Sequence, residues 1–244
     1  MMTIVAHRGY SGCYPENTML SFQKAVEAKT DEIELDVQLT KDHQVVVIHD
    51  ERVDRTTDGV GNVRDYTLKE IQKLDASKAG NGQFSSQRIP SFEEYCEWAS
   101  GQPVVTNIEL KTGIVYYPDI EQKTIDILEK YQLVGKVMFS SFNHLSLVNA
   151  KQICPEIPVG ALVGKNGIVN AGFYCKKFGF EFYHPSYEAL DDEKVKEIHD
   201  HGILMNVWTV NGMCELEKLQ RWGVRGVITN FPTVCRAYVR GLGL

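Results

Sequence analysis

The chain has 244 residues, a length that fits one large domain or two small ones and is typical of a single α/β barrel. Its hydrophobic share of 43% and charged share of 24% are ordinary for a globular protein, whose core at this size needs no disulfide or structural metal. The formal net charge of −6 argues against nucleic acid as the main partner, because a phosphate backbone selects a basic surface. A small phosphate ligand needs only local positive charge and is not excluded.

The cysteines are widely scattered, and none form a Cys-X-X-Cys pair, so the sequence indicates neither a zinc site nor a clear set of disulfides. We interpret them as small buried apolar residues: Cys13, Cys96, Cys154, Cys175, Cys214 and Cys235. The first strand-like run begins almost at once, which leaves no room for a signal peptide before the fold. No apolar stretch approaches the roughly 20 residues that span a bilayer. We therefore expect a cytoplasmic protein without stable membrane insertion.

Short β-type runs alternate with amphipathic helical runs along the chain. The predicted parallel strands are Thr3–Ala6, Glu32–Leu39, Val104–Leu110, Val137–Ser141, Val159–Val163, Phe180–His184, Ile203–Trp208 and Gly226–Thr229. The predicted helices are one capped by Asn17, then Phe92–Ala99, Ile120–Tyr131, His144–Ile153, Asp191–His201 and Met213–Trp222. Strands alternating with helices indicate a parallel sheet. At this length a closed (β/α)₈ TIM barrel is favoured over an open sheet.

One run departs from the alternation. Val45–His49 follows Glu32–Leu39 after only a Lys41-Asp42-His43 turn. A parallel crossover needs a dozen or more residues, so this run is predicted to form an antiparallel β-hairpin. The hairpin extends the barrel mouth and sets His49 roughly opposite Asp36.

Residues 51–88 are rich in Thr, Asp, Gly and Asn, as in Thr56-Thr57-Asp58-Gly59 and Gly80-Asn81-Gly82. One short helical segment is predicted near Leu68–Leu74. A loop this long inside a compact domain is usually functional. We interpret it as a small insertion after the second strand, within one domain that spans residues 1–244.

In α/β barrels the active site lies at the carboxyl ends of the strands, so ionisable residues there are candidates. Glu34 and Asp36 lie two apart in the second strand and therefore face the same way, and Glu109 lies in the third. Acidic side chains inside apolar runs are costly to bury unless a positive group pairs with them. Three carboxylates from neighbouring strands predict a site for one divalent cation, Mg²⁺ or Ca²⁺, with Mn²⁺ also compatible.

Two histidines and two cationic residues flank these carboxylates. His7 and His49 are expected at the same mouth, where imidazoles that titrate near neutral pH can act as general acid and general base. Arg8 and Lys111 supply positive charge for a phosphate oxygen. Together these groups predict phosphoryl transfer assisted by a divalent ion. The alternative is a structural network in which the carboxylates form buried ion pairs with Arg8 and Lys111.

Several other polar and aromatic residues have two open interpretations. Phe142 and Trp208 either line an apolar wall of the pocket or fill the barrel. Asn211 is expected either to cap the helix near Met213 or to touch substrate. Glu16 is expected to brace the mouth, with a pocket role left open. The remaining histidines are interpreted as surface or packing residues: His43, His144, His184, His199 and His201.

A set of short motifs recurs in order from residue 7 to about residue 232. They are His7-Arg8-Gly9, Pro15-Glu16-Asn17-Thr18, Glu34-Leu35-Asp36-Val37, His49-Asp50, Arg55-Thr56-Thr57, Leu74-Asp75, Ile89-Pro90, Glu109-Leu110-Lys111, Ser140-Ser141-Phe142, Trp208-Thr209-Val210-Asn211 and Thr229-Asn230-Phe231-Pro232. The ordered set resembles the signature of the glycerophosphodiester phosphodiesterases, which are related in fold to the phosphatidylinositol-specific phospholipases C. Asn230 stands where an Asp is common and Val53 where Leu is common. Neither departure is expected to touch the chemistry.

This resemblance implies hydrolysis of glycerophosphodiesters, such as glycerophosphocholine or glycerophosphoethanolamine, to glycerol 3-phosphate and an alcohol, and thus a place in lipid and glycerol metabolism. It implies the following roles: Glu34, Asp36 and Glu109 as metal ligands, His7 and His49 as the acid–base pair, and Arg8 and Lys111 as phosphate contacts. The nucleophile stays open between water and the glycerol 2-hydroxyl, which would form a cyclic phosphate as in the related phospholipases C. The preferred alcohol, the order of the two histidines and a homodimer also stay open.

Three rival functions remain. A lysophospholipase D-type activity on lipid substrates is the nearest. A metal-dependent isomerase or aldolase acting on sugar phosphates would need an enolising base or a Schiff-base lysine, for which Lys111 is the strand-end candidate. A catalytically inactive barrel that binds a phospho-ligand is the third, and the presence of both histidines and all three carboxylates disfavours it.

Overall fold

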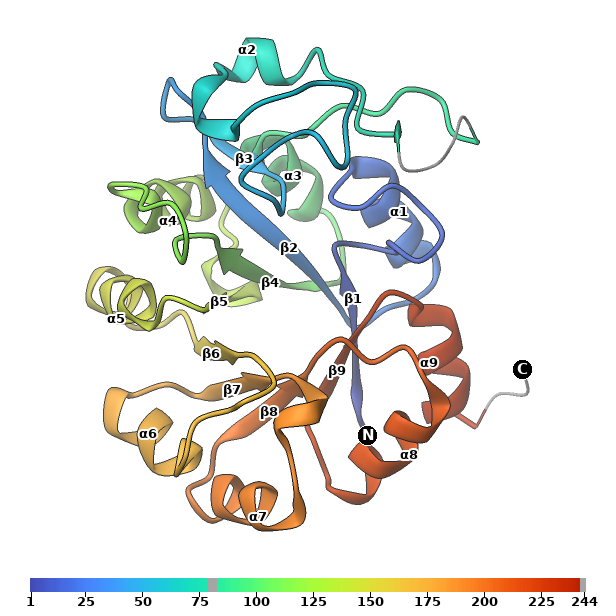
Figure 1. Cartoon of the computed structure of the whole chain (residues 1–244), viewed down its shortest axis with the longest axis vertical. Coiled ribbons are helices and arrows are strands. Elements are labelled where there is room, and N and C mark those ends of the chain that lie inside the picture. The colour runs from blue at the N-terminus through green and yellow to red at the C-terminus, as the bar shows by residue number, and fades with distance from the viewer. Residues whose placement is uncertain (79–82, 242–244) are drawn as a thin grey trace.

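The computed structural model describes residues 1–78 and 83–241, and its core is a closed barrel of parallel strands (Figure 1). The barrel strands are β1 (Thr3–His7), β2 (Glu32–Leu39), β4 (Val105–Leu110), β5 (Val137–Ser141), β6 (Val159–Val163), β7 (Phe182–Pro185), β8 (Leu204–Val207) and β9 (Gly226–Thr229). They are ordered β1-β9-β8-β7-β6-β5-β4-β2, and pairing of β1 with β2 closes the barrel. The predicted TIM barrel is confirmed.

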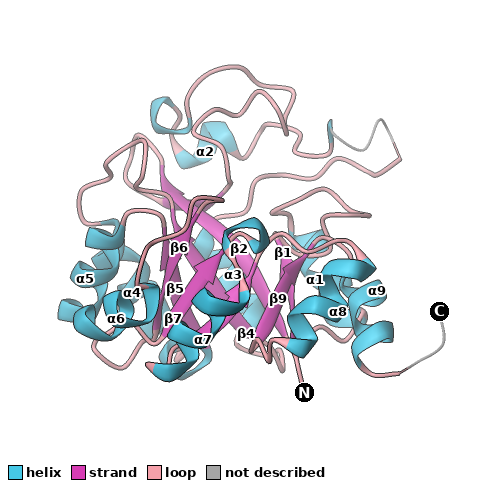
Figure 2. Ribbon diagram, turned by 60° about the horizontal axis from the view of Figure 1, so that its bottom comes forward, coloured by secondary structure: helices cyan, strands magenta, loops and turns pink. Residues whose placement is uncertain are grey.

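Helices surround the strands on the outside (Figure 2). They are α1 (Met19–Glu27), α3 (Phe92–Ala99), α4 (Ile120–Lys130), α5 (His144–Ile153), α6 (Ala171–Phe178), α7 (Asp192–Asp200), α8 (Met213–Arg221) and α9 (Pro232–Val239), with 3₁₀ turns at Val134–Lys136 and Tyr187–Ala189. Helices α6 and α9 are not among the predicted ones. Their buried residues are few and small: Ala171, Gly172 and Cys175 in α6, and Pro232 and Cys235 in α9, so neither shows a stripe of large apolar residues. None of the described helices combines the length and apolar character that a membrane crossing requires.

The cap of α1 is Thr18, so the prediction of Asn17 at this position is wrong. The Thr18 hydroxyl accepts a hydrogen bond from the Ser21 amide, and the Ser21 side chain accepts one from the Thr18 amide. Asn17 lies just before this capping box with a positive φ of 53°. Its amide donates to the Asp36 carboxylate at 2.8 Å instead. Two adjacent polar residues both suit a cap, and the contact with Asp36 decides between them.

The two faces of the barrel strands differ in chemistry. On β2 and β4, the apolar residues Ile33, Leu35 and Ile108 belong to the main hydrophobic core. Alternate side chains of a strand point to opposite faces, so the residues between them, Glu34 and Asn107 among them, face the barrel interior. In most TIM barrels that interior is filled by branched apolar side chains. Here it is polar near the mouth, which places charged groups where ligands enter.

Strand β3 (Val45–Val47) pairs with β2 in an antiparallel hairpin, which confirms the prediction of an extra strand outside the barrel. Val47 lies opposite Val37, and the Ile48 amide donates to the Asp36 carbonyl at 3.1 Å. His49 therefore lies one residue past the position opposite Asp36.

Between β3 and α3 the chain forms a small separate unit. It contains a 3₁₀ turn (Val63–Asp65) and α2 (Leu68–Ile71), and its apolar cluster consists of Val46, Ile48, Val53, Val63, Ile71, Ala76 and Ile89. In Figure 2 this unit lies beyond the carboxyl ends of the strands. The predicted loop motif Gly80-Asn81-Gly82 lies outside the described residues. The unit borders the mouth of the barrel and can contribute side chains to it.

Candidate active site

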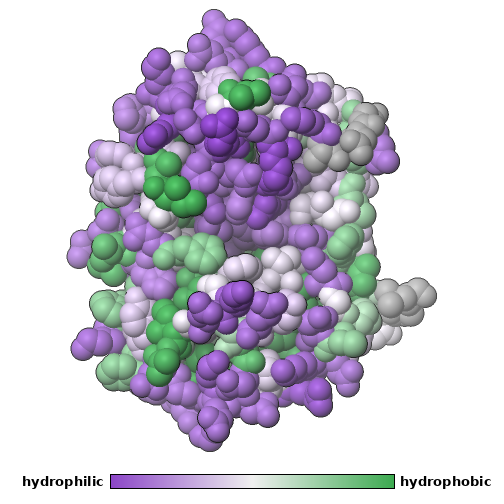
Figure 3. All heavy atoms as spheres, in the orientation of Figure 1, coloured by the Kyte–Doolittle hydropathy of each residue, from purple (hydrophilic) through white to green (hydrophobic). Residues whose placement is uncertain are grey.

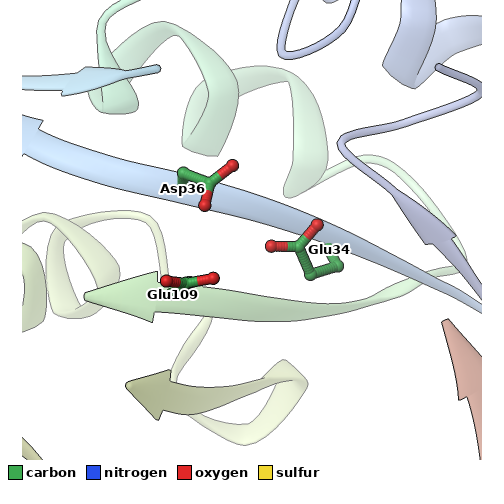
Figure 4. Close-up of side chains that lie close together, drawn as sticks. All are labelled: Glu34, Asp36 and Glu109. Carbon is green, nitrogen blue, oxygen red and sulfur yellow. The ribbon is translucent and has the colours of Figure 1, made fainter. Parts of the chain in front are cut away.

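Three carboxylates converge at the mouth of the barrel. Glu34 and Asp36 from β2 and Glu109 from β4 point toward one another (Figure 4), and each offers an oxygen within 4.8 Å of the others. The strand register explains the meeting, because Asp36 is paired with Glu109 across β2 and β4. Relative exposures of 3%, 0% and 8% for Glu34, Asp36 and Glu109 show that these acids are largely removed from water. Such a cluster needs positive charge in or beside it.

The electrostatics of this cluster fit a bound cation. Burial, followed by repulsion from Asp36, raises the pKa of Glu109 to about 7, and the same causes hold the pKa of Glu34 well above its usual value. Burial also acts to raise the pKa of Asp36, but Arg8 and Lys111 outweigh it and lower that pKa to about 2. One Asp36 oxygen, Oδ1, is buried without a hydrogen-bond partner among the described residues. Oxygen donors that repel one another are the ligands that Mg²⁺ and Ca²⁺ prefer, so the three residues fit a divalent ion.

Two cationic side chains border the carboxylates. The Arg8 guanidinium lies 2.8 Å from Glu16 and 3.6 Å from Asp36, while the Lys111 ammonium lies 2.8 Å from Glu109 and 3.9 Å from Asp36. These are the ion pairs of the structural alternative. They surround an open pocket rather than a packed interior, so the same groups can also bind an anion.

His7 ends β1 beside the carboxylates. Its Nδ1 lies 2.6 Å from the side-chain oxygen of Asn230, so this nitrogen carries the proton, and its Nε2 lies 4.0 Å from Glu34. Burial and then the charge of Arg8 lower the pKa of His7 to about 4, which leaves the ring neutral at neutral pH. The expectation that Asn230 does not touch the site is wrong, because Asn230 orients this imidazole. The sequence could not show this, since the two residues lie in β1 and after β9.

His49 follows β3 and has a different partner. Its Nδ1 lies 2.6 Å from Asp50, and its Nε2 lies 3.2 Å from the Lys111 ammonium. Burial acts to raise the pKa of Asp50, but hydrogen bonds from Arg55 and His49 lower it to about 2, so Asp50 is ionised at every working pH. Asp50 was not among the residues predicted for the site. Its position next to His49 in the chain was the available signal.

Arg55 joins the small unit to the mouth. Its guanidinium binds Asp50 at 2.6 Å and Glu16 at 2.7 Å, and Glu16 also binds Arg8. Glu16 therefore braces the mouth as expected. Arg55 was noted only as part of a motif. Its contacts link the two histidine-bearing segments, because Glu16 follows β1 whereas Asp50 follows β3.

A pocket of about 80 Å³ opens among these residues. Its lining consists of His7, Arg8, Glu34, His49, Asn107, Glu109, Ser140, Phe142, Leu162, Trp208, Thr209 and Ile228. The rings of Phe142 and Trp208 meet edge to face with centroids 5.6 Å apart, so both line the pocket wall. A second, wider pocket of about 340 Å³ shares His49, Glu109 and Phe142 and includes Lys111. Figure 3 shows hydrophilic residues along the upper border of a hollow near the centre of this face and residues of intermediate to apolar hydropathy along its lower border.

Other predicted assignments need correction. The Asn211 side chain accepts hydrogen bonds from Thr229 and from the Asn230 amide, so it neither caps α8, whose cap is Gly212, nor lines the pocket. Cys13 and Cys214 are exposed, in contrast to the other four cysteines. His184 needs no correction: it is fully buried inside the barrel beside Asn206, at a distance of 3.1 Å, which agrees with a packing role.

Comparisons with known proteins agree with this geometry. The sequence model of the Glycerophosphoryl diester phosphodiesterase family matches residues 7–234. A glycerophosphodiester phosphodiesterase of Caldanaerobacter subterraneus is 41% identical over 97% of both chains, and one of Bacillus subtilis is 38% identical over 97% of this chain and 86% of its own. The structure of an Oleispira antarctica phosphodiesterase in complex with the product sn-glycerol-3-phosphate superposes with a TM-score of 0.87 at 29% identity, covering 98% of this chain and 96% of that one. On this evidence the chain belongs to the glycerophosphoryl diester phosphodiesterase family.

Proposed function

We propose that this phosphodiesterase hydrolyses glycerophosphodiesters to glycerol 3-phosphate and an alcohol with the help of one divalent cation. The observation that carries the proposal is the convergence of three buried carboxylates, two histidines and two cationic side chains at the mouth of the barrel, beside the two pockets that open there. The Oleispira antarctica relative, whose structure contains sn-glycerol-3-phosphate, supports the same substrate class.

Glu34, Asp36 and Glu109 would hold the cation, with Mg²⁺ and Ca²⁺ as the first candidates and Mn²⁺ as a third. When bound, a divalent cation offsets the negative charge of the phosphate and of the transition state. Arg8 and Lys111 contribute in the same direction by binding phosphate oxygens. Lys111 now contacts His49 Nε2 and Glu109, so it has to turn toward the phosphate when substrate binds.

The two histidines divide the proton transfers. His7 is neutral with Nδ1 bound to Asn230, so its Nε2 lone pair can take the proton of the nucleophile. Ionised Asp50 binds His49 Nδ1 and fixes the orientation of that ring. With His7 as the base, His49 is the remaining imidazole at the mouth and protonates the alkoxide that leaves as the alcohol. The nucleophile is either water or the glycerol 2-hydroxyl. In the second case a cyclic phosphate forms, and water opens it with the two histidines in exchanged roles.

The remaining proposals concern the setting of the reaction. The whole chain would act as one catalytic domain, with residues 51–88 inserted beside the mouth. A cytoplasmic location is supported by the free thiols of all six cysteines, two of them exposed. A homodimer stays a prediction.

The test is release of glycerol 3-phosphate from glycerophosphocholine and glycerophosphoethanolamine by the purified protein, with Mg²⁺, Ca²⁺ or EDTA. Turnover should require a cation and should fall at least ~100-fold in Glu34→Gln and Glu109→Gln. The exposed Glu27→Gln variant, whose carboxylate pairs with Lys24 on the outer helix α1, is the matched control and should retain full activity. Release that persists in EDTA, or in both site variants, would contradict the proposal.

A further inference from the structure

Two buried polar side chains at the floor of the pocket have no assigned role. Asn107 on β4 and Ser140 on β5 are each 1% exposed and line the 80 Å³ pocket. Neither the Asn107 amide nor the Ser140 hydroxyl has a hydrogen-bond partner among the described residues. Buried polar groups are paired in nearly all native structures, so two adjacent strands that carry such groups toward one pocket indicate a polar occupant.

The strand register places Asn107 and Ser140 at the same level along the barrel axis as the carboxylates. Asn107 is paired with Glu34 across β2 and β4, and Ser140 is paired with Glu109 across β4 and β5. Register partners present their side chains on the same face. Asn107 and Ser140 therefore lie next to the proposed cation and phosphate position, within reach of the substituent directly attached to that phosphate.

We propose that Asn107 and Ser140 bind the hydroxyl groups of the glyceryl moiety, which fixes the orientation of the substrate; this rests on the proposed function. An amide and a hydroxyl both donate and accept hydrogen bonds, as the two glyceryl hydroxyls do. The small deep pocket holds the glyceryl group, and the leaving alcohol lies in the wider pocket of about 340 Å³, where Ile114 is 81% exposed.

The orientation has a consequence for specificity. A site built to hydrogen-bond a hydroxyl rejects an analogue that lacks it, because its own polar groups are then left buried and unpaired. The wider pocket has no comparable set of buried unpaired groups among the described residues. The enzyme is therefore selective for the glyceryl group and tolerant of the alcohol, and an acyl chain on the glyceryl group, as in a lysophospholipid, does not fit the deep pocket.

Calorimetric binding of sn-glycerol 3-phosphate and of propyl phosphate in the presence of Mg²⁺ tests the inference independently of turnover. Wild-type protein should bind glycerol 3-phosphate at least ~10-fold more tightly than propyl phosphate. Asn107→Ala and Ser140→Ala should each reduce this preference about 10-fold while changing the affinity for propyl phosphate less than about 3-fold. The matched control is Thr106→Ala, because Thr106 is buried on the same strand but bonds Tyr95 at 2.8 Å. It should lower stability and leave the preference unchanged.

The outcomes separate the inference from the proposed function. If both variants keep the preference for glycerol 3-phosphate over propyl phosphate, the inference is wrong and the two residues bind water. If both ligands bind equally more weakly and the Mg²⁺ affinity also falls, the inference is wrong and the two residues support the cation site. A preference that depends on Asn107 in a protein that releases no glycerol 3-phosphate supports the recognition and contradicts the proposed hydrolysis. Wild-type protein that binds neither phosphate ester contradicts both.

Discussion

The two histidines at the barrel mouth have partners of different charge. His7 Nδ1 binds the neutral Asn230, whereas His49 Nδ1 binds the ionised Asp50. Burial and the charge of Arg8 lower the pKa of His7 to about 4, so this ring is neutral and can act as the base, which leaves the acid role to His49. This asymmetry is the basis for assigning their order, which the sequence left open.

The first residue-scale prediction concerns these roles. His7→Asn and His49→Asn should each lower kcat about 10²–10⁴-fold on glycerophosphocholine, the usual contribution of a general acid or base. A 4-nitrophenyl ester of glycerol 3-phosphate should restore most of the activity of His49→Asn, because nitrophenolate leaves without a proton. It should not restore His7→Asn. If this ester restored the activity of His7→Asn and not that of His49→Asn, then His7 would be the acid and His49 the base.

The second residue-scale prediction concerns Asp50, which we expect to position His49. Asp50→Asn keeps the shape of the side chain but removes the carboxylate that binds His49 Nδ1 and orients the ring, so kcat should fall at least ~10-fold with little change in KM. Asp54→Asn serves as the control. Asp54 lies in the same segment and pairs with the exposed Arg52, away from the pocket. Equal effects of the two variants on kcat would show that Asp50 has no special role.

At the scale of elements, strand-like runs that alternate with helical runs, together with the chain length, predicted the barrel. Each strand exposes an apolar face to the helices, and the interruptions by Glu34, Asp36 and Glu109 marked the inner face at the mouth. The hairpin followed from the shortness of its turn. Helices α6 and α9 were missed, since the residues that they bury are few and small and form no stripe of large apolar side chains.

The candidate site was predictable only in part, and the reason is physical. Charged residues at strand ends are visible in the sequence because they interrupt apolar runs. Asn107 and Ser140 are uncharged and match the alternation of any strand, so nothing in the sequence assigned them a role, although Ser140 lies in one of the recurring motifs. The contact between His7 and Asn230 joins residues 223 positions apart, and only the closure of the barrel brings them together.

Close packing of α6 on α7 gives a prediction at this scale. A Cβ at Gly172 would lie 2.8 Å from the Glu197 carbonyl oxygen and 2.9 Å from Ile198 Cα, both backbone atoms that cannot turn aside. Gly172→Ala should therefore lower the free energy of unfolding by about 1–3 kcal/mol, the usual cost of overpacking, without changing kcat at 25 °C. Urea denaturation measures it. Gly164→Ala is the control, because no atom lies within 4 Å of its Cβ position. Equal stability of both variants would contradict the packing argument.

For the whole molecule, the carboxylate cluster makes stability depend on pH and cation together. In the absence of a cation, the pKa of Glu109 is raised from 4.5 to about 7, so the folded state binds more protons than the unfolded state between these values. The contribution of Glu109 to the free energy of unfolding is therefore fully present below pH 4.5 and is lost as pH rises through about 7. The loss amounts to roughly 3 kcal/mol.

Thermal unfolding in EDTA between pH 5 and pH 8 measures this effect as the difference between wild type and Glu109→Gln. The wild type should lose stability relative to the variant as pH rises. Mg²⁺ at 100 times its Kd should restore about 2.7 kcal/mol to the wild type at pH 8, and less at pH 5, where protons compete for the carboxylates. A difference that does not change with pH would contradict the repulsion described for this cluster.

The most direct test of the account is a Mg²⁺ titration that follows binding and turnover in the same protein. Calorimetry should give one cation per chain, with a Kd that equals the Mg²⁺ concentration for half-maximal release of glycerol 3-phosphate. In Glu34→Gln, binding and activation should both shift to higher concentration by the same factor, at least ~10-fold. Full turnover with no bound cation, or cation binding that Glu34→Gln leaves unchanged, would show that the three carboxylates at the barrel mouth are not the metal site of this phosphodiesterase.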